Sequence, residues 1–266
     1  MDTSANPPPP TAPRLAAAVA LLRPGASGGI EVFMVRRNVR SEFVPDVYVF
    51  PGGSVQAGDH EAEATAGLCA PVGEGPLPLG AGVRAAALRE LFEEAGTLLA
   101  YRRDERWQVD ASSLERFEGH RAELIAGRTT LGHIAAREGL RLATDALTYW
   151  AHWITPEAMP KRFDTHFFLA EERSGQAAVH DNVEVTASAW VTPEAALDGF
   201  ARGSFPLVFA TVRQLRDLLG LGSTAEAFAR FAGVTPPAIM PIAARAADGA
   251  IVVHIPGDPE GPTPLR

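Results

Sequence analysis

The sequence is poor in cysteine and lysine. Its 266 residues include one cysteine, Cys69, and one lysine, Lys161. A single thiol excludes an intrachain disulfide and favours a reducing compartment, so we expect a cytoplasmic protein. The remaining basic residues, histidines aside, are arginines, whose planar guanidinium groups suit bidentate phosphate binding. An Ala-rich, Lys-poor composition is also explained by the base composition of a genome, and we favour that explanation.

Long apolar runs and an excess of positive charge are also missing. No run reaches the roughly 20 residues that a membrane-spanning helix requires, and the run Leu15–Leu22 is better explained as a buried β-strand. The formal net charge of −8 argues against a general binder of nucleic acids or anionic membranes. The length suits one substantial domain, preceded by a disordered, Pro-rich lead over residues 1–13.

Three glutamates are concentrated in the segment Arg89–Gly96, RELFEEAG. Glu90, Glu93 and Glu94 have the spacing i, i+3 and i+4, which places them on one face of an α-helix. Taken by themselves, the charges are explained by a helix face that is exposed to solvent. Repulsion at this spacing is offset if a hard cation such as Mg²⁺ or Mn²⁺ binds the carboxylates. The upstream sequence Val49–Gly53, VFPGG, favours the cation site because a strand, a glycine turn and an acidic helix follow one another.

These two segments resemble the Nudix hydrolase motif, G-x5-E-x7-R-E-U-x-E-E-x-G-U, in which U is a bulky apolar residue. Gly53 matches the first glycine, and the segment from Arg89 to Gly96 matches the second half. The last U position is Thr97, a small departure. The larger departure is the separation of the two halves, since 35 residues lie between Gly53 and Arg89.

The first glutamate of the motif has no equivalent at the family spacing. Counting forward from Gly53 leads to Asp59, whereas counting back from Arg89 leads to Ala81. In the family this glutamate supports the motif arginine. Asp59 and Glu61 are the candidates for that role here.

The long separation is similar to a branch of the family that contains coenzyme A diphosphatases with an insert inside the motif. The approach segment VRRNVRSEFVPDVYVFPGG and the segment Arg162–Ala170, RFDTHFFLA, also resemble that branch. The resemblance covers residues 14–255 and implies an α/β Nudix fold, in which a mixed β-sheet is sandwiched between helices. A helical insert after the motif helix is part of the same resemblance.

Two segments have no assigned role. Residues 54–81 form the insertion within the motif, which is either a lid or specificity element beside the site or a surface appendage. Residues 205–255 form a helical C-terminal extension, which either covers the core or provides the surface of a homodimer. Residues 256–266 are expected to be a flexible tail.

The rest of the chain alternates strand and helix patterns. The predicted strands are Leu15–Leu22, Ile30–Val35, Tyr48–Phe50, Leu147–Ile154, a half-buried Arg162–Ala170, Val183–Val191 and Ala250–Ile255. The predicted helices are one or two turns within Asp59–Leu68, the motif helix, Ser113–Ile125, Thr130–Glu138, a short helix from Thr192, Leu207–Leu219 and Thr224–Phe231.

The resemblance implies a role for each motif residue. Glu90, Glu93 and Glu94 would hold Mg²⁺ or Mn²⁺, and Arg89 would orient them. Glu94 or Glu184 would accept a proton from the attacking water. Glu184 lies near the start of the predicted strand Val183–Val191. Alternatively, it is an ordinary surface glutamate without a catalytic role.

Two pairs of residues are candidates for substrate binding. Arg36 and Arg37 end a predicted strand near the PGG sequence, where they would contact a pyrophosphate or, equally, be solvated. Gly52 and Gly53 are expected to form a turn whose backbone N–H groups reach a phosphate.

The function expected from the resemblance is metal-dependent hydrolysis of a nucleoside diphosphate linked to another group. The branch suggests coenzyme A or acyl-coenzyme A, cut to 3′,5′-ADP and a 4′-phosphopantetheine. ADP-ribose, a dinucleotide or a capped RNA end are alternative substrates, of which RNA fits the acidic chain least. A Nudix-fold module that binds a ligand without cutting it is the alternative outside enzymes, although such modules typically lose motif glutamates and this chain retains all three.

Overall fold

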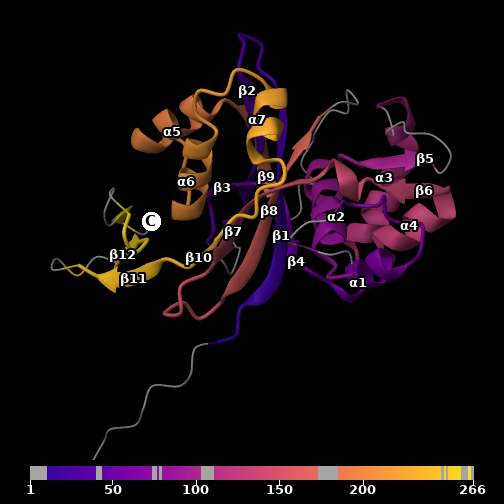
Figure 1. Ribbon diagram of the computed structural model, residues 1–266, viewed down its shortest axis with the longest axis horizontal. Helices are drawn as coiled ribbons and strands as arrows, with labels where there is room; N and C mark the ends of the chain where they lie inside the picture. Colours follow the sequence, from indigo (N-terminus) through magenta and orange to yellow (C-terminus); the bar gives the residue numbers. More distant parts are fainter. Residues whose placement is uncertain are drawn as a thin grey trace, which may run out of the picture.

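The computed structural model describes residues 11–39, 44–73, 77, 80–102, 111–172, 185–246, 249, 251–258 and 263–264. Its centre is an eight-stranded mixed sheet with helices on both faces (Figure 1). The expected α/β fold, with a sheet sandwiched between helices, is therefore confirmed.

The main sheet has the order β10-β7-β8-β1-β2-β3, with β4 paired to β1 and β9 paired to β2. The pairs β1/β8 and β7/β10 are parallel, and the other pairs are antiparallel. Its strands are β1 Arg14–Pro24, β2 Ile30–Arg37, β3 Tyr48–Val49, β4 Gly52–Ser54, β7 Thr148–Ile154, β8 Phe163–Glu171, β9 Val185–Val191 and β10 Ala238–Ile239.

Two small sheets flank the main one. The first pairs β5 with β6, and the second has the order β11-β12-β13. Their strands are β5 Ala100–Arg102, β6 Leu140–Leu142, β11 Ile242–Arg245, β12 Ile251–His254 and β13 Thr263–Pro264. Strand β13 pairs with β12 and lies within residues 256–266, whose flexibility stays a prediction.

The helices form two groups on opposite faces of the sheet (Figure 1). The first group is α1 Ala57–Ala64, α2 Val83–Ala95, α3 Ala111–Ile125 and α4 Leu131–Glu138. The second group is α5 Pro193–Ala201, α6 Phe209–Asp217 and α7 Thr224–Phe231. A 3₁₀ turn, η1, spans Thr144–Ala146. Thr130, Thr192 and Ser223 cap three of these helices through their side-chain oxygens.

Strand β1 is buried on both faces. Ala17, Val19 and Leu21 pack into the core beneath α2, whereas Ala18, Ala20 and Leu22 pack into the core beneath α6 and α7. This explains why Leu15–Leu22 is continuously apolar rather than alternating.

Strand β8 differs from its prediction as a half-buried strand. His166 and Phe168 are buried on the α2 side, while Leu169 is buried in the opposite core. Both faces are covered because the C-terminal extension supplies α6 and α7 over the second face. The extension therefore covers the core, which was one of its two predicted roles, and it adds β10 beside β7.

Within the described residues, no helix has both the length and the apolar character needed to cross a membrane.

Candidate active site

The motif helix α2 presents its glutamates toward the β4 edge of the sheet. Glu90 and Glu94 are 8% and 6% exposed, and the side chain of Glu93 is 15% exposed. The helix ends at Ala95 and is capped by Gly96, whose φ of 69° is a conformation that side-chain-bearing residues rarely adopt. Glu90 and Glu94 are thus buried and Glu93 is half-buried, so the three do not form a solvated helix face.

Arg89 is the centre of the site. Its Nη1 donates to Glu90 Oε1 at 2.8 Å and to Glu93 Oε2 at 2.7 Å. Its Nε and Nη2 donate to the two oxygens of Asp59, each at 3.0 Å, and Nη2 also donates to the Ser54 carbonyl. Burial disfavours the charged guanidinium, but the surrounding carboxylates, Glu90 first, outweigh burial and raise the pKa of Arg89. Arg89 therefore contacts Glu90 and Glu93 directly, and its role in orienting the glutamates for a metal ion stays a prediction.

Asp59 occupies the position of the missing motif glutamate. Its side chain is 3% exposed, whereas Glu61 is exposed to solvent. Asp59 Oδ2 also accepts from the Gln56 backbone N–H at 2.9 Å, so the carboxylate bridges the start of α1 and the motif arginine. Of the two candidates for support of Arg89, the structure favours Asp59.

The insertion of residues 54–81 is joined to the motif helix by a second carboxylate. Glu63, at 8% exposed, accepts from the backbone N–H groups at the start of α2. The four donors lie at 2.8–2.9 Å and belong to Gly80, Gly82, Arg84 and Ala85. The first turn of a helix leaves such N–H groups without intrahelical partners, and an anion at that end is also favoured by the helix dipole. The α1 part of the insertion is therefore not a surface appendage.

Replacing Glu63 by alanine is expected to lower the free energy of unfolding by about 2–3 kcal/mol, because buried N–H groups lose a charged acceptor. Urea denaturation monitored by circular dichroism measures the change. Glu61→Ala is the matched control, since Glu61 lies on the same helix and is exposed. Equal denaturation midpoints for the two variants would contradict this role of Glu63.

Gly52 and Gly53 do not form the predicted turn. They lie in strand β4, opposite Ala18 and Ala17 of β1, and neither has a positive φ. The Gly52 N–H donates to Glu94 Oε2 at 2.9 Å, so in this structure it contacts a motif carboxylate. The reason for glycine is close packing, because a Cβ at Gly52 would meet β1 at Ala18 and a Cβ at Gly53 would meet Glu90 of the motif helix.

The two glycines are expected to respond differently to alanine. A Cβ at Gly52 would lie 2.7 Å from the Ala17 carbonyl oxygen, a backbone atom that cannot move aside, so Gly52→Ala should destabilise the fold. A Cβ at Gly53 would meet the carboxylate of Glu90, which can rotate away. Gly53→Ala should therefore keep its melting temperature but lose about 10²-fold in turnover through a displaced Glu90. Melting curves and kcat, measured side by side, test this difference; a stable, active Gly53→Ala variant would count against it.

The predicted substrate arginines lie where β2 pairs with β3. Arg36 is opposite Tyr48 and forms an ion pair with Asp46 at 2.9 Å. The Asp46 hydrogen bond raises the pKa of Arg36. Arg37 is half-buried at the end of the same strand. Arg36 also lies over the ring of Tyr48, which packs against the core on the face of the sheet opposite the motif helix. Contact of either arginine with substrate stays a prediction. Glu184 lies outside the described residues.

The donor set fits a hard divalent cation. One guanidinium faces the carboxylates of Asp59, Glu90 and Glu93, and Glu94 lies beside them against Gly52. Neighbouring carboxylates with little solvent exposure repel one another, and a bound cation would offset that repulsion. Carboxylate oxygens are the preferred ligands of Mg²⁺ and Mn²⁺. The glutamates could therefore hold such an ion.

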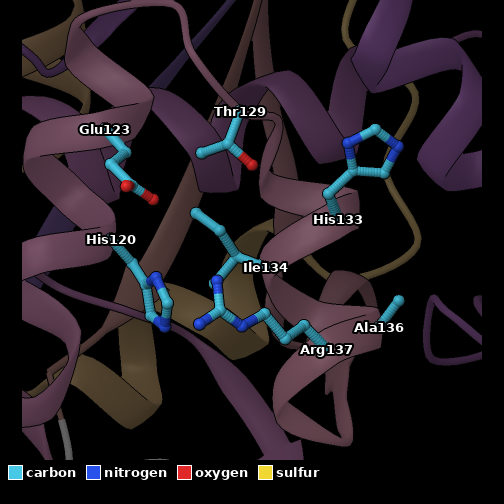
Figure 2. A pocket seen from close by; sticks show the side chains of 7 residues that line it. All are labelled: His120, Glu123, Thr129, His133, Ile134, Ala136 and Arg137. Carbon is cyan, nitrogen blue, oxygen red and sulfur yellow. The ribbon is translucent and has the colours of Figure 1, made fainter.

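A pocket of about 370 Å³ lies apart from the motif residues, between α3 and α4 (Figure 2). His120 and Glu123 line it from α3, and Ile134 and Arg137 line it from α4. None of the predicted site residues lines this pocket among the residues that the structure describes.

Known proteins similar to this chain were found by sequence and by structure. The profile described as the NUDT19 Nudix domain matches residues 69–217. Acyl-coenzyme A diphosphatase NUDT19 of Xenopus laevis is 26% identical, over 87% of this chain and 72% of that protein. The Homo sapiens protein of the same name is 28% identical, over 89% and 73%. A crystal structure of a NUDIX hydrolase from Alicyclobacillus acidocaldarius is 26% identical and superimposes with a TM-score of 0.71, over 85% of this chain and 99% of that one.

Proposed function

Because the chain belongs to the Nudix hydrolase family, in its NUDT19 branch, we propose that it is a metal-dependent diphosphatase of coenzyme A or its acyl esters. The products are 3′,5′-ADP and the corresponding 4′-phosphopantetheine. The observation that carries the proposal is the group of three glutamates beside strand β4, in which Arg89 contacts Glu90 and Glu93 and the Gly52 N–H contacts Glu94. The names of the relatives supply the substrate class.

The motif carboxylates bind the metal and position the reaction. Nudix enzymes typically depend on a divalent metal, and we propose Mg²⁺ or Mn²⁺ at Glu90, Glu93 and Glu94. Such an ion offsets the charge of the pyrophosphate and makes a water molecule more acidic. Glu94 or Glu184 would accept a proton from the attacking water. Arg89 fixes the directions of Glu90 and Glu93.

The chain also supplies candidate contacts for the substrate anion. Arg36 and Arg37 sit at the strand connection that leads to Gly52, and a guanidinium suits the oxygens of a pyrophosphate. Arg36 donates a hydrogen bond to Asp46. A substrate phosphate that binds Arg36 would therefore share its guanidinium with Asp46. Arg37→Ala is expected to raise KM more than it lowers kcat if Arg37 contributes binding alone.

A substrate panel tests the proposal. Coenzyme A, an acyl-coenzyme A, ADP-ribose and NADH are each incubated with the full chain and Mg²⁺ or Mn²⁺, with an EDTA-treated sample as control. Preferential, metal-dependent release of 3′,5′-ADP from the coenzyme A substrates is expected. Cleavage of ADP-ribose or NADH alone would replace the substrate class and keep the hydrolase. Absence of cleavage in the whole panel would support the non-catalytic binding module instead.

A further inference from the structure

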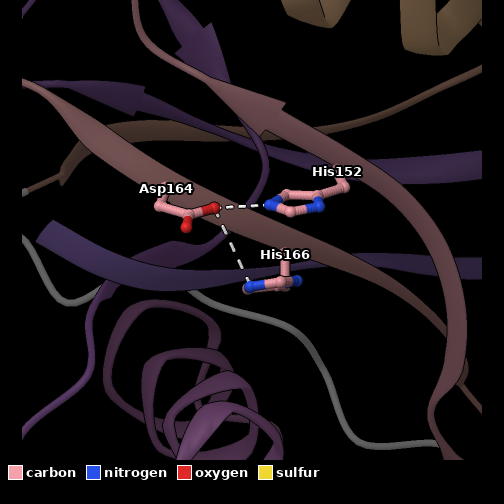
Figure 3. A group of neighbouring side chains, drawn as sticks. All are labelled: His152, Asp164 and His166. Atoms are coloured by element: carbon pink, nitrogen blue, oxygen red, sulfur yellow. Dashed lines mark hydrogen bonds and ion pairs between the residues drawn. The ribbon is translucent and has the colours of Figure 1, made fainter. Parts of the chain in front are cut away.

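A second group of potential metal ligands lies on strands β7 and β8, with no member among the motif residues. It consists of His152, Asp164 and His166, whose ligand atoms lie within 4.8 Å of one another (Figure 3). Both histidines direct Nε2 at the same oxygen, Oδ1 of Asp164, at 2.5 Å and 3.8 Å. The two imidazole rings are stacked, with centroids 4.2 Å apart. Three side chains therefore converge on one point.

The sheet register produces this convergence. His152 is directly opposite His166 in the antiparallel pair of β7 and β8, so both side chains lie on one face. Asp164 lies two residues before His166 on β8 and so points to the same face. All three belong to regular strands rather than to loops, which favours a fixed ligand geometry.

A hydrogen bond with Tyr149 holds the ring of His166, and the Nε2 of His166 faces the other two side chains of the group. Tyr149 Oη lies 2.8 Å from the Nδ1 of His166, and the Nε2 of His166 is too far from Asp164 for a hydrogen bond. An outer partner on one ring nitrogen, with the other nitrogen directed at an ion, is the usual arrangement of histidine ligands. Ligand atoms bound at about 2.1 Å from one ion are about 3–3.5 Å apart. Small movements of the three side chains would bring their ligand atoms to these separations.

The chemistry of the group differs from that of the motif glutamates. Two imidazoles and one carboxylate suit Zn²⁺, Mn²⁺, Fe²⁺ or Co²⁺, whereas all-oxygen sets suit Mg²⁺. His166 is in the ligand form at neutral pH, since burial and the neighbouring His152 lower its pKa to about 4.

The group shares a face of the sheet with the candidate active site. Gly53 is paired with Ala17, Ala17 with His166, and His166 with His152. Glu90 lies over Gly53 on this face, because a Cβ there would meet its carboxylate. At about 4.8 Å per strand, His166 is about 10 Å across the sheet from Gly53. The two donor sets are therefore neighbours without a common ligand.

We infer that His152, Asp164 and His166 bind one divalent transition-metal ion at a site separate from the motif glutamates. The inference does not depend on the proposed hydrolase function. Its test measures binding and needs no turnover.

The test is isothermal titration of the metal-free full chain with ZnCl₂, and separately with MnCl₂. The wild type and the double variant Glu93→Gln/Glu94→Gln are expected to retain a transition-metal site of equal affinity. His152→Ala and Asp164→Asn are expected to weaken that site at least about tenfold, since even outer partners of a ligand contribute this much. His133→Ala is the matched control, because His133 is an exposed histidine on α4. Melting temperatures without metal establish that each variant is folded.

Two results would overturn the inference. One is unchanged affinity in both His152→Ala and Asp164→Asn. The other is loss of all transition-metal binding in the double glutamine variant, because the ion would then occupy the motif glutamates. Since two ligands are altered independently, failure of one variant to fold leaves the other to decide.

Discussion

Replacing Glu94 by glutamine is expected to lower kcat by about 10²–10⁴-fold, the usual contribution of a group that transfers a proton, while the protein stays folded. Glutamine keeps the shape of the side chain and an oxygen that can accept from the Gly52 N–H, as Glu94 Oε2 does at 2.9 Å. It removes the negative charge that a metal ion or a proton requires. Glu93→Gln should act in the same direction through the loss of a charged ligand.

The measurement is steady-state kinetics with coenzyme A and Mg²⁺, combined with a melting curve for each variant. Glu118→Gln is the matched control, because Glu118 is an exposed glutamate on α3. Near-wild-type kcat in Glu94→Gln would remove this residue from the mechanism and leave Glu184 as the candidate base. If Glu93→Gln were equally active, the motif glutamates would not be the metal site.

The motif helix could be predicted from sequence because its determinants are local. The apolar residues, the spacing of Glu90, Glu93 and Glu94, and Gly96 all lie within one continuous segment, and the helix ends at Ala95, directly before Gly96. The strand pair β1 and β2 follows from two apolar runs joined by a glycine-containing turn, and it was predicted nearly to its ends. Local periodicity carries this information without any knowledge of packing.

The contacts within the site could be predicted only in part, because they join distant parts of the chain. Asp59 and Arg89 are 30 residues apart, so the broken motif leaves both Asp59 and Glu61 as candidates. Burial separates them, and burial depends on the packing of α1 against α2. Glu63 had no sequence signal, because its acceptor role depends on where the loop before α2 brings the backbone N–H groups.

The glycines and strand β8 show a second limit of sequence patterns. The PGG sequence suggested a turn, since glycine is frequent where φ is positive, yet Gly52 and Gly53 are extended and are needed for close packing. Alternation in β8 suggested one buried face, but the C-terminal helices cover the other. Single-sequence patterns describe the local backbone and do not identify what a later segment packs against.

Asp59 should contribute more to the free energy of unfolding than any other carboxylate side chain of the insertion. Asp59→Ala is expected to lower the free energy of unfolding by about 3–5 kcal/mol, the usual cost of breaking a buried ion pair. Both partners are 3% exposed, so solvent cannot replace the lost acceptor of Arg89 Nε. The Gln56 N–H loses its partner at the same time. Turnover should also fall, because Arg89 would no longer be held in the orientation that fixes Glu90 and Glu93.

Asparagine separates charge from shape at this position. Asp59→Asn keeps the volume but has one acceptor oxygen, and its NH₂ group would face a guanidinium or a backbone N–H. We therefore expect Asp59→Asn to destabilise nearly as much as Asp59→Ala, whereas a packing role would leave it near the wild type. Urea denaturation of both variants, with Glu61→Ala as the control on the same helix, measures the difference. A double-mutant cycle with Arg89→Met isolates the pair itself: a coupling energy near zero would mean that Asp59 stabilises α1 alone and does not take the place of the missing motif glutamate.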